Sequence, residues 1–176
     1  MGFNNVYSDG DNMSLEYVFQ IGEKFEVNDK HESATSEFIE DTEQYDRKQM
    51  TQKQVAGYLA QFVIADNYAL PPPTIDSRFD LYDFVMHKNT VDMKASMLPI
   101  PSLIIESHKI QDADVFLLFT VNSKEVTFLG GTTQQRIIEN PDIFKLQNMN
   151  GKLVYMLPAS ELTNIKIDAL GVEEYV

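Results

Sequence analysis

The segment from Asp83 to Lys94 constrains the fold of this chain most strongly. Two apolar runs flank a short polar break at residues 87–90, and such runs are typical of adjacent strands in a β-hairpin. Side chains alternate along a strand, so Asp92 and Lys94 should project from one face and Met93 from the other. If Asp83 shares their face, two carboxylates and one ammonium group meet in a small volume. Oxygen ligands of this kind can hold a divalent cation, with a lysine beside it to stabilise charge.

In this segment and its flanks the chain resembles the PD-(D/E)XK nuclease superfamily, which has the restriction-endonuclease-like fold. Asp83 matches the first Asp of that motif, and Asp92 and Lys94 match its second acidic residue and its Lys. Small members of the superfamily, many of them from phages, often carry a helical Glu before the hairpin, where this chain has Gln61. The resemblance covers roughly residues 52–170, and within it the hairpin motif is the chemically specific part.

This resemblance implies a metal-dependent nuclease, with an Mg²⁺-dependent DNA endonuclease as the first expectation. Asp83, Asp92 and the backbone carbonyl of Met93 would hold Mg²⁺, for which Mn²⁺ can substitute. Lys94 would orient the attacking water and stabilise charge on the phosphorus centre, and Gln61 would reach the site from its helix. Because Gln61 replaces an acidic residue, the number of metal ions stays open. The expected partner is nucleic acid.

The other elements are expected to build an α/β fold with a mixed central sheet flanked by helices. Apolar residues recur at helical spacing over Asp46–Tyr68, with Thr51 as a second N-cap, and prolines 71–73 end this helix. Ala113–Val121 and Glu125–Gly131 are predicted strands, followed by a short helix.

The acidic residue Asp80 needs its own interpretation. It lies three residues before Asp83, so the two would face opposite sides of a regular strand. Without a bulge only one of them can be the metal ligand, and the nine-residue step to Asp92 favours Asp83. We expect Asp80 at the strand start, capping it or pairing with Arg78. The three histidines are scattered and the chain has no cysteine, so a zinc site is not expected.

Charge divides the chain into two parts. The net charge is −13, and residues 1–46 hold twelve acidic and two basic residues, whereas residues 47–176 hold fifteen and twelve. We interpret residues 1–46 as an acidic N-terminal arm and 47–176 as the nuclease-like domain. Within the arm, Leu15–Val27 is expected to form a strand or edge hairpin. Asn28–Asp46 is expected to be a solvated loop, or a loop leading into an amphipathic helix.

The acidity argues against strong nonspecific binding to DNA, because phosphate-binding proteins generally show a basic face. A homodimer, a protein partner at the arm or a structured substrate would then add affinity. Two other functions stay open: a catalytically silent nuclease-like binding protein, and an acidic DNA mimic or inhibitor that engages a basic protein.

The sequence also bears on location. No apolar run is long enough to cross a membrane, and the first residues lack a signal-peptide pattern. The absence of cysteine fits a reducing compartment. We therefore expect the cytoplasm, or the host cytoplasm if a phage encodes the chain.

Overall fold

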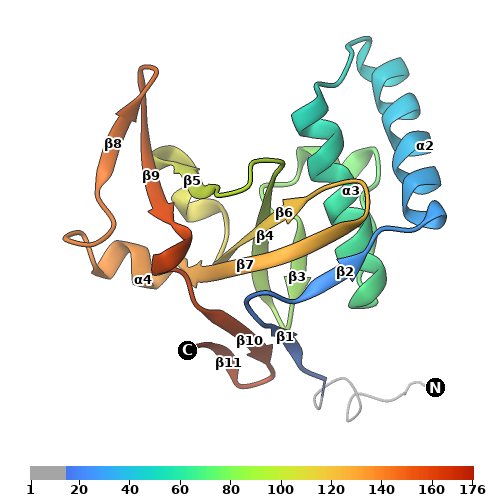
Figure 1. The fold of residues 1–176 in the computed structure, drawn as a ribbon. Helices are drawn as coiled ribbons and strands as arrows, with labels where there is room; N and C mark the ends of the chain where they lie inside the picture. The colour runs from blue at the N-terminus through green and yellow to red at the C-terminus, as the bar shows by residue number, and fades with distance from the viewer. Residues whose placement is uncertain (1–14) are drawn as a thin grey trace.

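The computed structural model describes residues 15–176. They form an α/β fold around a mixed five-stranded sheet with helices on its flanks (Figure 1), which confirms the expected fold class. Neighbouring strands of this sheet are antiparallel except β4 and β6, which are parallel. In order across the sheet the strands are β2 (Lys24–Glu26), β7 (Glu125–Thr133), β6 (Val115–Val121), β4 (Asn89–Ser96) and β3 (Phe84–Met86).

Two smaller sheets and three α-helices complete the described residues. One sheet contains β1 (Tyr17–Phe19), β10 (Asn164–Asp168) and β11 (Gly171–Tyr175), and the other β5 (Ser102–Glu106), β9 (Lys152–Pro158) and β8 (Leu146–Met149). The α-helices are α2 (Asp29–Asp46), α3 (Gln52–Asn67) and α4 (Gln134–Glu139), and the 3₁₀ turns are η1 (Asp76–Phe79), η2 (Ser107–Asp112) and η3 (Ala159–Glu161). No helix among residues 15–176 is both long and apolar enough to cross a membrane.

The central sheet is buried on both faces, which explains the continuous apolar run of β6. Leu117 and Phe119 point into a core shared with Val63 of α3. Phe116 and Leu118 point the other way, into a second core beneath β5 and β9. Burying a side chain of this size contributes about 1.5–3 kcal/mol, so both layers hold the central strands in place.

The expected single helix over Asp46–Tyr68 is wrong at its start, because two helices meet there. Helix α2 ends at Asp46, and Arg47 takes the left-handed conformation that closes it, with φ 55°. Helix α3 begins after Thr51, whose hydroxyl accepts from the N–H of Gln54 at 3.2 Å. Thr51 is therefore the N-cap of the second helix, as the sequence indicates.

Residues 29–46 form one helix, so the expected solvated loop is wrong; of the two alternatives the helix forms, but without a loop of these residues before it. The Asn28 side chain accepts from the N–H of His31, and the His31 ring accepts from the N–H of Asn28, both at 3.1 Å. Phe38 packs its ring 4.6 Å from that of Tyr58 on α3. The acidic segment is thus anchored along one side.

Residues 15–27 supply two strands that do not pair with each other. β1 pairs with β10, and β2 pairs with β7 at the edge of the central sheet. Tyr68 also donates from its hydroxyl to the carbonyl of Val18 at 2.7 Å. An isolated edge hairpin is therefore not what forms here, and residues 1–14 of the expected arm lie outside the described residues.

Candidate active site

The β3–β4 hairpin predicted from the sequence is confirmed, with a tighter turn than expected. Only His87 and Lys88 connect the strands, and both have positive φ, 47° and 68°. Two such residues make a type I′ turn, whose twist matches that of the flanking strands. The Asn89 amide donates to the His87 carbonyl at 3.0 Å. This short turn fixes which residues of the two strands face one another.

Asp83 lies just before β3, where its backbone and side chain both contact β4. Its N–H donates to the carbonyl of Val91 at 2.9 Å, and its Oδ2 accepts from the N–H of Met93 at 2.9 Å. The carboxylate therefore takes the partner position that a further residue of β3 would otherwise fill. It is held by the backbone, half-buried, at the end of the paired strand.

Asp92 and Lys94 share one face of β4, as the alternation predicts. The Lys94 Nζ lies 3.1 Å from the Asp92 Oδ2, and the two side chains are 41% and 16% exposed. Met93 points to the opposite face and is 6% exposed. Lys94 therefore has a fixed position beside the carboxylate without being removed from solvent.

The two carboxylates lie close enough to disturb each other. Burial raises the pKa of Asp83 to about 8, with the neighbouring Asp92 carboxylate as the second cause, while the Met93 N–H and Lys94 act in the opposite direction. Like charges brought together in a partly desolvated place favour the uptake of a proton or a cation.

The Met93 carbonyl is placed by the same register. In a strand, the N–H and C=O of one residue point to the same side, and the Met93 N–H points toward Asp83. Its carbonyl therefore faces the side on which β3 has already ended, since the last paired residues are Phe84 and Val91. Within residues 15–176 no three acidic or histidine side chains gather closely enough to hold a metal ion by themselves, so a carbonyl and water would be needed.

Gln61 reaches the site from a different side than Asp92 and Lys94. It lines a cavity of about 380 Å³ together with Asp83, Tyr58 of α3, Tyr82 and the prolines 71–73. We call this cavity the tyrosine pocket. The structure thus brings Gln61 to the cavity of Asp83, but not to the one that Asp92 and Lys94 line.

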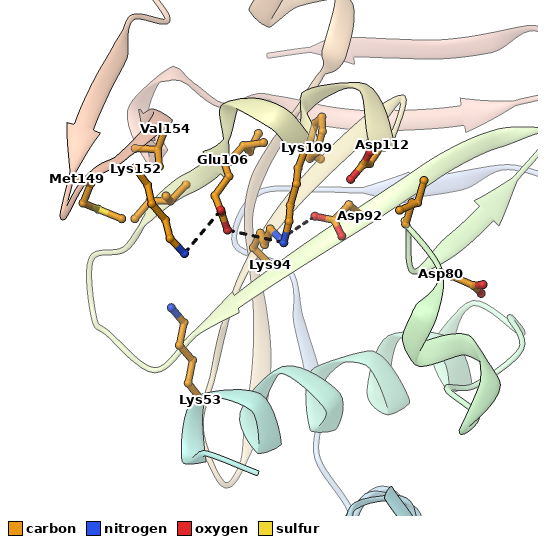
Figure 2. A pocket seen from close by; sticks show the side chains of 14 residues that line it. Lys53, Asp80, Asp92, Lys94, Glu106, Lys109, Asp112, Met149, Lys152 and Val154 are labelled. Atoms are coloured by element: carbon orange, nitrogen blue, oxygen red, sulfur yellow. Dashed lines mark ion pairs between the residues drawn. The ribbon is translucent and has the colours of Figure 1, made fainter. Parts of the chain in front are cut away.

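Asp92 and Lys94 line a larger cleft of about 520 Å³ with three further lysines. Lys53 comes from the first turn of α3, Lys109 from η2 and Lys152 from β9. Figure 2 shows Lys53 and Lys152 pointing toward one another from opposite walls. We call this cavity the lysine cleft. Sequence analysis missed these three lysines because they come from separate elements and share no spacing.

Glu106 pairs with two of these lysines and partly neutralises them. Its oxygens lie 3.7 Å from the Lys109 Nζ and 3.8 Å from the Lys152 Nζ. Partial burial would raise the pKa of Glu106, but Lys109 and Lys152 outweigh it, so the pKa lies below its usual range. An anion entering the cleft could therefore replace Glu106 as the ion-pair partner of Lys109 and Lys152.

Asp80 differs from its expected role. Arg78 pairs with Asp46 at 2.9 Å instead, and Asp80 lines both the lysine cleft and the tyrosine pocket. Asp112, at the end of η2, is a further acidic residue of the lysine cleft. Both are additional acidic groups in the cavities that the carboxylate pair lines.

The residues predicted from the sequence therefore lie around one place, where Asp83 and Asp92 meet between two cavities. Their arrangement can attract a cation and can receive a phosphate on the lysine side. Comparison of the chain with protein families and with curated proteins finds no match.

Proposed function

We propose that this chain is a metal-dependent nuclease with a restriction-endonuclease-like core, and that it hydrolyses phosphodiester bonds, with DNA as the first expected substrate. The observation that carries the proposal is the convergence of Asp83 and Asp92 with Lys94 3.1 Å from one of them. Carboxylates that crowd each other beside a fixed ammonium are costly for stability alone. Such an arrangement is commoner where chemistry requires it.

The donor set fits Mg²⁺, with Mn²⁺ as a substitute. Asp83, Asp92 and the Met93 carbonyl would hold the ion, because hard cations take oxygen ligands and keep several waters. The raised pKa of Asp83 indicates a place where positive charge is favoured. A bound Mg²⁺ would supply Lewis acidity toward a phosphoryl oxygen and lower the pKa of a coordinated water.

Lys94 would act on the negative charge that develops at the phosphate. Its ammonium is held by Asp92 at 3.1 Å and is 41% exposed, so it is placed in advance and still accessible. A donor fixed in this way stabilises a transition state without having to reorganise. The Gln61 amide can both donate and accept a hydrogen bond, and would help to orient a water or phosphate on the Asp83 side.

The lysine cleft bears on the objection that the chain is too acidic. Four of the fourteen basic residues line this one cavity: Lys53, Lys94, Lys109 and Lys152. Phosphate contacts supply most of the affinity of nonspecific nucleic-acid binding. Four carboxylates line the same cavity, those of Asp80, Asp92, Glu106 and Asp112, so its formal charge is zero, against −13 for the whole chain, and a bound Mg²⁺ would make it positive.

Cleavage of a labelled panel of nucleic acids tests this proposal. The panel contains single-stranded, duplex, flapped and circular DNA and RNA, each with Mg²⁺ or Mn²⁺. We expect the wild type to cut and Lys94→Ala to be inactive with an unchanged melting temperature. Lys124→Ala, in the exposed turn before β7, is the matched control and should cut like the wild type. Activity retained by pure Lys94→Ala would refute the proposal.

Helix α2 favours one second function, an acidic mimic that binds a basic protein. Its exposed side chains are largely acidic and carry one lysine, Lys30. Salt-sensitive binding to a basic protein, without affinity for divalent ions, would favour this function. Divalent-ion binding that Asp83→Asn abolishes would favour the nuclease.

A further inference from the structure

The carboxylate pair lies at the boundary between two cavities of different character. Asp92 lines the lysine cleft, Asp83 lines the tyrosine pocket, and Asp80 lines both. A phosphate bound at the pair would therefore have lysines on one side and tyrosines and prolines on the other. A nucleotide has the same two parts, a charged backbone and an aromatic base.

The walls of the tyrosine pocket are aromatic and rigid. Tyr58 packs against the ring of Phe38, with the ring centres 4.6 Å apart, and Tyr82 packs against the second core. Prolines 71–73 form another wall, and proline has little backbone freedom to lose when a ligand binds. The volume of about 380 Å³ lies within the range of pockets that enclose small ligands.

The polar groups of the pocket suit a base as well. Gln61 offers an amide that can both donate and accept, which matches the edge of any base. Asp83 lines the pocket and also belongs to the carboxylate pair, so it connects the two. Arg78 also lines the pocket, but Asp46 holds its guanidinium at 2.9 Å. Recognition there would therefore come from stacking and from amide contacts rather than from a free cation.

We propose that the tyrosine pocket takes an unpaired nucleotide base next to the bound phosphate, so that single-stranded nucleic acid is the substrate class. This inference rests on the proposed nuclease site. A base inside the duplex cannot enter such a pocket without leaving its stack, which costs a few kcal/mol. An unpaired strand has no such cost.

The charge of the chain favours the same substrate class. A duplex binder needs a broad basic face, whereas this chain carries −13 and places four of its lysines in one cleft. Stacking on aromatic side chains contributes about 1–3 kcal/mol per base and requires no positive charge. A single strand can therefore bind with fewer phosphate contacts.

Fluorescence anisotropy with the full chain in EDTA tests the inference without cleavage. The probes are a labelled oligothymidylate, an abasic strand of the same length, and the oligothymidylate paired with its complement. We expect the wild type to bind oligothymidylate about tenfold or more tightly than either of the other probes. Equal affinity for the abasic strand or the duplex overturns the inference, and so does the absence of binding to all three.

Two variants locate the effect in the pocket. Tyr82→Ala should weaken oligothymidylate binding about tenfold and leave abasic-strand binding unchanged, whereas Tyr82→Phe should bind like the wild type because it keeps the ring. A folded Tyr82→Ala that binds oligothymidylate normally would place the base elsewhere and overturn the inference. If Tyr82→Ala does not fold, the comparison of probes with the wild type decides.

The two proposals fail separately. A wild type that binds oligothymidylate selectively in EDTA but cuts nothing with Mg²⁺ contradicts the nuclease proposal, while the base pocket is supported. A wild type that cuts but binds duplex as tightly as single strand contradicts the base pocket, while the nuclease proposal is supported.

Discussion

Arg78 and Asp83 both line the tyrosine pocket, and they differ in how completely their charges are matched. The Arg78 side chain is 6% exposed and pairs with Asp46 at 2.9 Å. Its guanidinium also lies over the rings of Tyr45 and Phe79, 4.8 Å and 4.1 Å from their centres. This buried cation has a complete set of partners, and such a set serves stability.

Asp83 lies at the same pocket with an incomplete set. One oxygen accepts from the Met93 N–H at 2.9 Å, but the charge that acts on it most strongly is another carboxylate, Asp92; burial and this carboxylate raise the pKa of Asp83. The contrast distinguishes charges that stabilise the fold from charges that a ligand could match. Arg78 is matched by the fold itself, whereas Asp83 and Asp92 have a single ammonium between them, that of Lys94 on Asp92, so a second positive charge is left for a ligand to provide.

The largest expected effect comes from removing one charge of the carboxylate pair. Asp92→Asn keeps the shape of the side chain but removes a ligand charge and the partner of Lys94. We expect cleavage in Mg²⁺ to fall by at least about 10²-fold, the loss typical of one preorganised electrostatic contact. Single-turnover cleavage of the labelled panel measures this, with Asp142→Asn, which does not line either cavity, as the matched control. Equal rates for Asp92→Asn and the wild type would show that the carboxylate pair has no role in cleavage.

The matched group should show the opposite response, a loss of stability rather than of chemistry. Arg78→Ala removes the guanidinium from Asp46 and from both rings. We expect a loss of about 1–3 kcal/mol in unfolding free energy, less than for a fully buried pair because Asp46 is 38% exposed. Urea denaturation measures it.

Lys88→Ala, in the exposed hairpin turn, provides the control for Arg78→Ala. If both variants have the same stability as the wild type, the partner set around Arg78 does not support the fold.

The pH dependence of stability sharpens the comparison further. The folded pKa of Asp83, about 8, lies above its ordinary value of 3.8. The folded state therefore holds this proton more tightly, so the stability that the proton contributes is present below pH 4 and is lost as the pH rises through about 8. Asp83→Asn keeps the acceptor for the Met93 N–H and removes this loss.

Thermal unfolding in EDTA measures that difference. We expect Asp83→Asn to match the wild type at pH 4 and to exceed it by about 1–2 kcal/mol at pH 9, a figure reduced for solvent screening because Asp83 is only half-buried. Mg²⁺ should narrow the gap at pH 9 by stabilising the wild type. A variant that is less stable than the wild type at pH 9 would show that the carboxylate charge is matched after all.

The sequence predicts the carboxylate pair because the signals for it are local. The two apolar runs place Asp92 and Lys94 on one face, and the polar break between the runs marks the turn. The start of α3 is local too, since Thr51 forms its cap with Gln54. Elements whose defining contacts lie within a few residues of each other can therefore be predicted from the sequence.

Helix α2 is harder to predict from the sequence, for a physical reason. It has few apolar positions, and its capping residue three places after Asn28 is His31 rather than the usual Glu or Gln. Its anchor, Phe38 against Tyr58, joins two helices. Lys53, Lys109 and Lys152 are harder still, because their meeting depends on how α3, η2 and β9 pack around the sheet.

These long-range lysines carry the smallest expected effect and separate binding from chemistry. Lys53 and Lys152 point into the cleft from opposite walls (Figure 2) but do not touch the carboxylate pair in any described ion pair. Lys152→Gln should weaken oligothymidylate binding a few-fold and reduce the slope of log affinity against log salt by about 0.7, the value for one phosphate contact on a single strand. Lys53→Gln should do the same, and Lys124→Gln should do neither. Anisotropy titrations at several salt concentrations measure the slope. A slope that stays unchanged in both cleft variants would mean that phosphates do not pass between these walls. The contrast between charges matched by the fold and charges left for a ligand would then be confined to Asp83, Asp92 and Lys94.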